Sequence, residues 1–267
     1  MESGYSGSRV IMNGATAHAG FEGVVKIVRF NVQFYLVSTI SLVAAGLLLA
    51  SKGLSPFSED LVICIAAVVA FWTLSSLLVS WYVYDRAGVT RWEWLPTQLP
   101  LVPHRWANIH AGFDESTSRL RQLLPGTEGS AVDIYDPGEM TEASIARARR
   151  IHPANEPFER GTYDALPLLE NSSDAVFLLF AAHELRDEKH RKHLLRQIAR
   201  VLREKGCVVL VEHLRDWRNF MAFGPGFLHF YSRRNWLRNT REAGLIVLRE
   251  DFVTPFVKCF VLRRADP

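Results

Sequence analysis

Two long stretches without a charged side chain constrain this chain more than any other feature. They are residues 30–51 and 61–84, and each exceeds the roughly 20 residues that a helix needs to cross about 30 Å of hydrocarbon. The segment between them, SKGLSPFSED, collects Gly, Pro and the intervening charges, as an exposed turn does. We therefore predict a two-helix transmembrane hairpin over residues 30–85. A pair of buried helices in a large soluble core is the alternative, although soluble helices of this length nearly always carry a charged face.

Positive charges indicate the orientation of this hairpin. The turn offers Lys52 alone, beside two acids, whereas both flanks are richer in cations: Arg9, Lys26, Arg29, Arg86, Arg91 and Arg105. Cytoplasmic flanks carry the excess of Lys and Arg, so we expect an integral protein of the inner (cytoplasmic) membrane with both termini in the cytoplasm. The expected organisation is a mobile cytoplasmic tail (1–29), the hairpin (30–85), a connector near the headgroups (86–105) and a cytoplasmic domain (106–267).

Composition excludes several functional classes. Hydrophobic residues make up 48% of the chain, which is too many for a disordered protein. The net charge of +3, without a dense basic block, argues against nucleic-acid binding. Cys64, Cys207 and Cys259 are too far apart for a CxxC metal site. His190 and His193 lie on a highly charged segment that is typical of a solvated helix face, so we expect no metal.

Beyond residue 106 the sequence alternates short apolar runs with amphipathic ones, which predicts a doubly wound α/β sheet. The expected strands are 106–112, 130–136, 174–181, 207–213, 245–251 and 256–264. The expected helices are 115–124, which precedes the second strand, 141–150 with Thr141 as its cap, 184–205 and 233–243. Only residues 252–255 join the last two strands, too few for a parallel crossover, so these strands should pair antiparallel. Such sheets bind ligands at the carboxyl ends of their strands.

The segment GTYDALPLLENSSDAVFLLFAAHEL (161–185) contains an Asp before a Leu-Pro pair, then an SxDxV strand and a His at the strand end. It resembles the middle of class I S-adenosylmethionine-dependent methyltransferases of the small-molecule and quinone type. IARVLREKGCVVLVEHL and REAGLIVLREDF resemble the later parts of that family, so the resemblance covers about residues 106–264. It implies a seven-stranded Rossmann-like sheet with a terminal antiparallel hairpin, and S-adenosyl-L-methionine as cofactor.

The resemblance also implies cofactor-binding residues. Asp133, 21 residues beyond Gly112, corresponds to the acid that binds the ribose hydroxyls, with Asp136 as an alternative. Asp164 corresponds to the acid at the adenine amino group, with Ala165 and Leu166 near the ring. Each of these carboxylates could instead be a turn or cap residue.

The glycine-rich loop departs from the family pattern. His110 stands where an acid is expected, and Asp114 and Ser116 stand where the second and third glycines belong. Glycine lets the backbone approach a ligand without a Cβ in the way. The loop is therefore rebuilt, or the cofactor sits differently, or binding has been lost.

Two histidines at strand ends are candidates for catalysis. His183 follows the fourth strand and has a pKa range suited to removing a proton from a phenol or enol, or it simply bonds within its loop. His213 follows the fifth strand, where relatives place a residue that contacts the acceptor. The aromatic segment 217–236 could form an acceptor pocket or pack as ordinary helix; its candidate substrate-binding residues are Phe223, Phe227, His229 and Tyr231.

Together these features suggest a membrane-anchored methyltransferase that modifies an oxygen or carbon of a lipophilic small molecule, such as a quinone-like compound, a polyketide or a pigment lipid. Its expected partners are that acceptor and the bilayer; the oligomeric state is open. The alternatives are a catalytically inactive membrane scaffold of the same fold and a related enzyme that uses the fold for another reaction.

Overall fold

The computed structural model describes residues 20–51, 53–152 and 156–265. These residues form two compact units. One unit comprises residues 20–87 together with 216–227, and the other comprises residues 88–215 together with 228–265. Residues 1–19 of the predicted tail lie outside the described residues.

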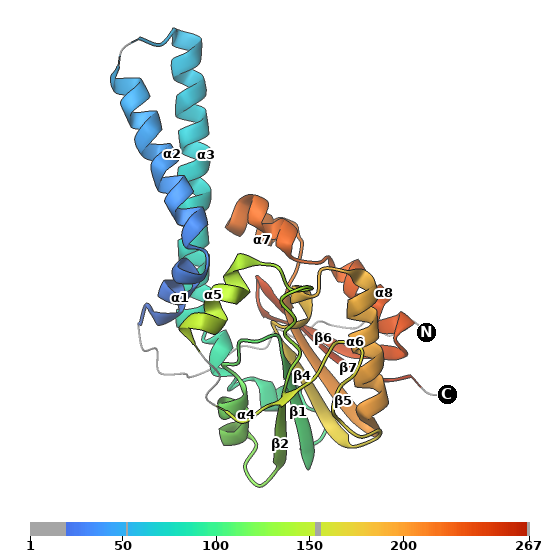
Figure 1. The fold of residues 1–267 in the computed structure, drawn as a ribbon. Helices are drawn as coiled ribbons and strands as arrows, with labels where there is room; N and C mark the ends of the chain where they lie inside the picture. Colours follow the sequence, from blue (N-terminus) through green and yellow to red (C-terminus); the bar gives the residue numbers. More distant parts are fainter. Residues whose placement is uncertain (1–19, 52, 153–155, 266–267) are drawn as a thin grey trace, which may run out of the picture. The chain divides into compact units, whose positions relative to one another are not determined.

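The first unit is helical (Figure 1). Its helices are α1 (Glu22–Phe30), α2 (Val32–Ala50), α3 (Pro56–Ser80) and α7 (Trp217–Phe223), and a π-helical turn, Trp81–Arg86, continues α3. Ser55 starts α3 by accepting a hydrogen bond from the amide of Ser58, and Pro56 takes the first position, where its missing N–H costs nothing. Helix α1 corrects part of the sequence prediction, because residues 22–29 were expected to belong to the mobile tail.

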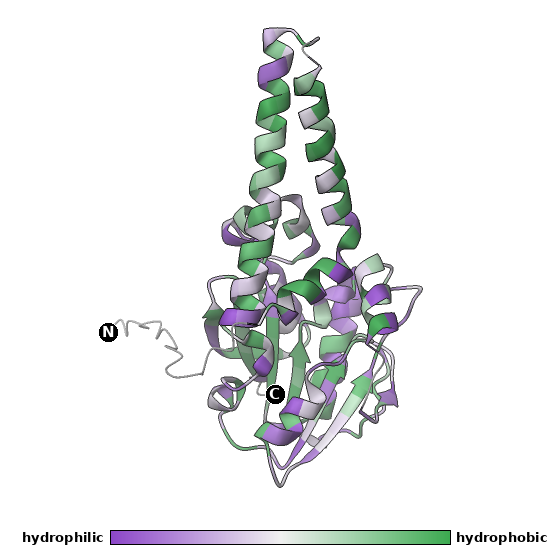
Figure 2. Cartoon of the chain, turned by 90° about the vertical axis from the view of Figure 1, so that its left-hand side faces the viewer, coloured by the Kyte–Doolittle hydropathy of each residue, from purple (hydrophilic) through white to green (hydrophobic). Residues whose placement is uncertain are grey.

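Helices α2 and α3 are packed with their large apolar side chains outward. The buried residues of the two helices are the small residues Ser38, Ser76 and Ser80, and the hydroxyl groups of Tyr35 and Ser76 are 3.0 Å apart. Hydrophobic residues cover most of both helices in Figure 2. Small residues at the contact and large apolar residues outside are the arrangement of helices packed in lipid. Both helices are long and apolar enough to cross a membrane, and most of their described residues are not buried.

Helix α7, although distant in sequence, packs on α3. The rings of Trp72 and Phe220 meet edge to face with centroids 5.4 Å apart. Gly224 follows at a φ of +53°, and a Cβ there would lie 2.6 Å from the Trp72 ring. The predicted acceptor segment is thus divided: Phe223 and Phe227 belong to the helical unit, whereas His229 and Tyr231 belong to the other.

The second unit is the predicted α/β domain. Its seven strands have the order β3-β2-β1-β4-β5-β7-β6. The strands are β1 (Arg105–His110), β2 (Glu128–Asp133), β3 (Glu159–Arg160), β4 (Ser173–Leu179), β5 (Leu202–His213), β6 (Leu245–Thr254) and β7 (Val257–Arg264). The helices are α4 (Thr117–Leu123), α5 (Ala143–Ile151), α6 (Glu188–Val201) and α8 (Arg233–Glu242).

Parallel pairing runs from β3 to β5, and β7 is antiparallel to both β5 and β6. This confirms the predicted sheet with its terminal hairpin. The central strands are apolar because helices cover them, and Val208–Val211 of β5 are fully buried. Helix α6 is shorter than predicted, since residues 202–205 extend β5 instead of the helix. Helix α5 begins after Glu142 without a side-chain cap, so the cap predicted at Thr141 is wrong.

The connector before β1 is part of the α/β unit. Trp92, Trp94 and Leu95 have at most 6% of their surface exposed, and the Trp92 ring lies 5.9 Å from that of Phe180. The predicted placement of this segment near the headgroups is therefore corrected: its tryptophans fill a core, and the domain begins near Gly88.

Gly224 offers a test of the contact between α7 and α3. We expect Gly224→Ala to lower the free energy of unfolding by about 1–3 kcal/mol, because alanine is strained at this backbone conformation and its Cβ meets the Trp72 ring. Thermal unfolding of the full chain in detergent measures the loss. Gly226→Ala is the matched control, since the nearest atom there is 3.8 Å from the added Cβ and its φ lies outside the left-handed region. Equal midpoints for the two variants would contradict this packing.

Candidate functional site

The carboxyl ends of β1, β2, β4 and β5 lie at one edge of the sheet, because these strands are parallel neighbours. In doubly wound sheets this edge binds the ligand. Two clusters of charged side chains occur here: one follows β4 and β5, and the other lies between β1 and β2.

His183 is the centre of the first cluster. It lies in a 3₁₀ turn, Ala182–Glu184, directly after β4, and has 9% of its surface exposed. Glu212, at the end of the neighbouring strand β5, is fully buried. Its Oε2 lies 2.6 Å from His183 Nδ1, and its Oε1 accepts a 3.2 Å hydrogen bond from the His183 amide. Both carboxylate oxygens of Glu212 thus fix the position of His183.

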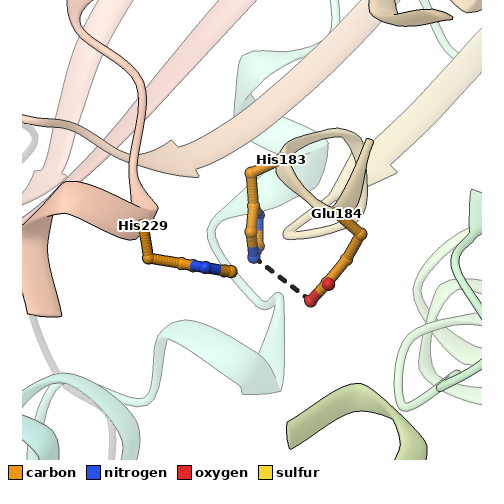
Figure 3. A group of neighbouring side chains, drawn as sticks. All are labelled: His183, Glu184 and His229. Carbon is orange, nitrogen blue, oxygen red and sulfur yellow. Dashed lines mark ion pairs between the residues drawn. The ribbon is translucent and has the colours of Figure 1, made fainter. Parts of the chain in front are cut away.

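Two further side chains complete this cluster (Figure 3). Glu184 Oε1 lies 3.4 Å from His183 Nε2, and the rings of His183 and His229 are edge to face, 5.0 Å apart. Arg186 holds His229 in place by donating a 2.6 Å hydrogen bond to its carbonyl oxygen. The sequence predicts His183 as a catalytic residue and His229 as a substrate-binding residue, and the structure brings these two side chains together.

The charges around His183 decide its protonation. Burial alone lowers the pKa of His183, but the carboxylates of Glu212 and Glu184 outweigh it and raise the pKa to about 10. Burial and the adjacent positive charge of His183 lower the pKa of His229 to about 4. At neutral pH His183 is therefore the protonated histidine of the pair, and His229 is neutral.

Ligand atoms of His183, Glu184 and His229 all lie within 4.8 Å of one another, close enough to hold a metal ion. A second cation is also nearby, because Arg186 Nη1 lies 3.5 Å from His229 Nδ1. Positive charge in so small a space opposes a divalent ion, so we interpret the cluster as a site that holds a proton on His183. The other two histidines considered from the sequence have different surroundings. His190 contacts Glu139 at 2.8 Å, and His193 is exposed.

The second cluster lies where β1 and β2 end. Gly112 has a φ of +86°, and Asp133, at the tip of β2, is 2% exposed. Arg149 of α5 connects them: its Nη1 is 2.7 Å from Asp133 Oδ2 and 3.4 Å from the Gly112 carbonyl oxygen. The guanidinium also lies over the Tyr135 ring, 4.4 Å from its centroid. Arg149 therefore links Asp133 to the turn at Gly112.

The rest of the predicted glycine-rich loop has a structural role. Asp114 Oδ1 accepts hydrogen bonds from the amides of Ser116 (2.9 Å) and Thr117 (3.0 Å) and from Asn108 Nδ2 (3.2 Å). These bonds fix the start of α4, so the loop is rebuilt around a capping carboxylate. His110 is buried, which lowers its pKa despite the nearby carboxylates of Asp114 and Asp133.

The remaining cofactor candidates lie at the rim of the sheet. Asp136 is exposed and accepts a 2.7 Å hydrogen bond from the Gly138 amide. Asp164 is exposed in the turn after β3 and accepts a 2.7 Å bond from the Thr162 hydroxyl. Ala165 is exposed, and Leu166 is 5% exposed in the core.

Two candidates for contact with the acceptor have packing roles instead. Tyr231 is 9% exposed in the core, its hydroxyl donates to the Arg186 carbonyl oxygen, and Arg191 lies 3.6 Å over its ring. His213 is 5% exposed, stacks between Phe180 and Phe230, and its Nδ1 lies 2.9 Å from the Phe256 carbonyl oxygen. Their prediction as substrate-binding and catalytic residues is corrected on this geometry, because both rings are covered by neighbours.

The strand end at residues 212–214 is one of the places where the sequence predicts ligand contacts, but sequence reasoning assigned no role to Glu212, and it missed Arg149. Glu212 is an acid directly after the apolar run CVVLV, a pattern that marks a buried charge in need of a partner. Arg149 lies in the run RARR, and the sequence contains no signal that distinguishes it from its neighbours.

Comparison with known proteins bears on this geometry. Residues 123–210 match the methyltransferase domain family. This stretch of the chain is similar to that family. Over 145 residues it is 33% identical to a Bacillus subtilis protein named uncharacterized methyltransferase YcgJ; the match covers 53% of this chain and 52% of that one. The chain thus spans about half the length of this relative.

The fold is shared with a solved structure. That of mitomycin 7-O-methyltransferase MmcR is 15% identical, with a TM-score of 0.53 over 91% of this chain and 72% of that one. A SAM-dependent methyltransferase from Aquifex aeolicus is also 15% identical, with a TM-score of 0.49 over 67% of this chain and 95% of that one. The class I methyltransferase fold, predicted from the sequence, is confirmed.

The raised pKa of His183 depends on Glu212. In Glu212→Gln the neutral amide no longer stabilises the imidazolium, so we expect the pKa of His183 to fall well below about 10 and the proton to leave at lower pH. Histidine-selective NMR titration of the full chain in detergent measures this shift. Glu204→Gln, an exposed acid on the same strand, is the control and should leave the titration of His183 unchanged. An unshifted His183 in Glu212→Gln would contradict the assigned cause.

Proposed function

We propose that this protein is a membrane-anchored S-adenosylmethionine-dependent methyltransferase that modifies an oxygen or carbon of a lipophilic small molecule. The observation that carries the proposal is the pair of strand ends at β1 and β2, where Arg149 links the buried carboxylate of Asp133 to the positive-φ turn at Gly112. In a methyltransferase-type sheet this is the edge where a nucleoside binds.

This pair of strand ends fits the cofactor chemically. Arg149 donates hydrogen bonds to Asp133 Oδ2 and to the Gly112 carbonyl oxygen. The two hydroxyl groups of a ribose are also donors, so they can replace the guanidinium at these acceptors. The side chain of Arg149 is 27% exposed, which leaves it a path toward solvent. Asp133 and Gly112 would hold the ribose, and Asp164 is the remaining candidate for the adenine amino group.

Bound S-adenosylmethionine supplies an electrophilic methyl group, so the protein contributes mainly alignment of the acceptor and stabilisation of its charge. At neutral pH His183 is protonated, because its pKa is raised to about 10, so it cannot take up the acceptor's proton. We assign it the role of hydrogen-bond donor to an acceptor oxygen that has lost its proton to solvent. Glu212 holds Nδ1, which leaves Nε2, on the Glu184 side, as the donating atom.

The helical unit supports a membrane location. Helices α2 and α3 are long and apolar enough to cross a bilayer, and their outward side chains include Ile40, Leu47 and Leu78, each more than 60% exposed. An anchor of this kind confines the enzyme to the membrane in which a lipophilic acceptor is dissolved. The effective concentration of the acceptor near the enzyme is therefore raised.

An inactive scaffold of the same fold is the second candidate. The observation that favours it is the ion pair at these strand ends: Arg149 already satisfies Asp133, and the loop glycines are replaced by Asp114 and Ser116. A scaffold keeps this ion pair, whereas an enzyme exchanges it for the cofactor.

Cofactor binding separates the two candidates. We expect S-adenosylhomocysteine to bind the full chain, and Asp133→Asn to weaken it by about tenfold or more, because hydrogen bonds to a charged group are worth about 1.5–3 kcal/mol. Arg149→Gln should bind more tightly than the unchanged protein, because the competitor for Asp133 is removed. Isothermal titration calorimetry measures all three affinities, with Arg147→Gln on the same helix as the control. Absence of binding to both the unchanged protein and Arg149→Gln would favour the scaffold.

Methyl transfer itself is tested on lipids. Mass spectrometry of extracts from cells with and without the protein should reveal a lipophilic compound that gains one methyl group. For an acceptor that reacts as its oxyanion, His183→Ala should lower kcat by about 10²–10³-fold while the affinity for S-adenosylhomocysteine is retained. If binding and turnover fell together in this variant, His183 would have a structural role only.

A further inference from the structure

Helix α7 packs on α3 well before the end of α3, and this position indicates how deep α7 lies. Trp72, the contact residue, lies eight residues before the end of α3 at Ser80, which is about 12 Å along the helix at 1.5 Å per residue. Leu74 and Leu78 lie between Trp72 and that end, and they are 59% and 64% exposed. The exposed apolar surface of α3 therefore extends past α7 on the way to Ser80. If Leu74 and Leu78 are in hydrocarbon, α7 is at membrane depth as well.

Helix α7 also has the surface that this depth requires. Trp217 and Met221, one turn apart, are 70% and 44% exposed, although both are apolar. Phe220 covers Trp72 beside them, so that α7 contacts α3 through one part of its surface and leaves an apolar strip uncovered. The one charged side chain within α7, Arg218, lies 5.6 Å over the Trp217 ring, and a long cationic side chain reaches the headgroups from such a position.

We propose that α7 lies inside the bilayer leaflet in which α3 ends, with Trp217 and Met221 in contact with lipid acyl chains. This inference rests on the membrane anchoring in the proposed function. Lipid is favoured over a protein partner because the apolar strip of α7 continues the exposed apolar surface of α3 with which it packs. A single exposed tryptophan on a protein surface is ordinary and does not indicate a lipid contact. Trp217 and Met221, however, lie beside a proposed transmembrane helix and extend its apolar surface.

The position of α7 in the chain gives this contact a function. Residues 216–227 join the end of β5, which carries Glu212, to His229. If α7 lies in the leaflet, segment 216–227 between these two site residues is in the bilayer, where a lipophilic acceptor is dissolved. This assigns the acceptor a membrane-dissolved class and makes segment 216–227 the part of the chain that meets it first.

The experiment places a fluorophore on α7 in full-length protein reconstituted in phospholipid vesicles. Cys64 is replaced by serine; Cys207 and Cys259 are buried, and burial raises the pKa of both thiols to about 12, so they stay unlabelled. An environment-sensitive nitrobenzoxadiazole label is then attached to Met221→Cys, with Trp217→Cys as a second position. Leu74→Cys on α3 reports the anchor, and Leu169→Cys, at a residue 80% exposed on the α/β unit, reports water.

Spin-labelled lipids and aqueous iodide quench the label in separate runs. We expect the labels at residues 221 and 74 to lose most of their emission to spin-labelled acyl chains and little to iodide, and the label at residue 169 to behave in the opposite way. If residue 74 is quenched by lipid but residue 221 by iodide, the inference is overturned while the anchor stands. If neither quencher reaches residue 221, a protein surface covers α7 and the inference is equally overturned. If residue 74 itself is quenched by iodide, the membrane part of the proposed function fails.

Discussion

The parallel pairing of β4 with β5 is the constraint on which the candidate active site depends. Its register sets Leu179 beside Val211, so the turn after β4 meets the end of β5. Glu212 is fully buried there, and a buried carboxylate without a partner would cost several kcal/mol. His183 provides that partner at 2.6 Å and in return keeps a proton. The pair therefore stabilises the strand ends and creates a histidine with an unusual pKa through the same contact.

The same principle operates between β1 and β2, with a different outcome. Asp133 is also buried at a strand tip, but its partner, Arg149, comes from a helix and remains partly exposed. An interaction with an exposed partner can be exchanged for another donor, whereas the Glu212–His183 pair is enclosed on both sides. This contrast supports ligand exchange at the Asp133–Arg149 pair and retention of a proton at the Glu212–His183 pair.

The α2–α3 hairpin buries small residues and exposes large apolar ones: Ser38 and Ser76 are buried, whereas Leu47 and Leu78 are more than 60% exposed. In the proposed membrane location this arrangement follows from packing in lipid, because large apolar residues lose nothing by facing acyl chains and small residues let helices approach. Helix α7, although far from α3 in the sequence, joins this unit at the Trp72 contact.

The sequence by itself determined the two long apolar segments, the alternation of strands and helices and the terminal antiparallel hairpin, because each depends on residues close together in the chain. Tertiary structure decided the rest. His183 and Glu212 are 29 residues apart, and Asp133 and Arg149 are 16 apart; no local periodicity pairs such residues. The burial of Trp92 and Trp94, expected near headgroups, and the packing of Tyr231 and His213, expected to contact the acceptor, were likewise set by what neighbouring elements cover. Composition states which side chains are apolar or ionisable, but only the fold decides which of them meet.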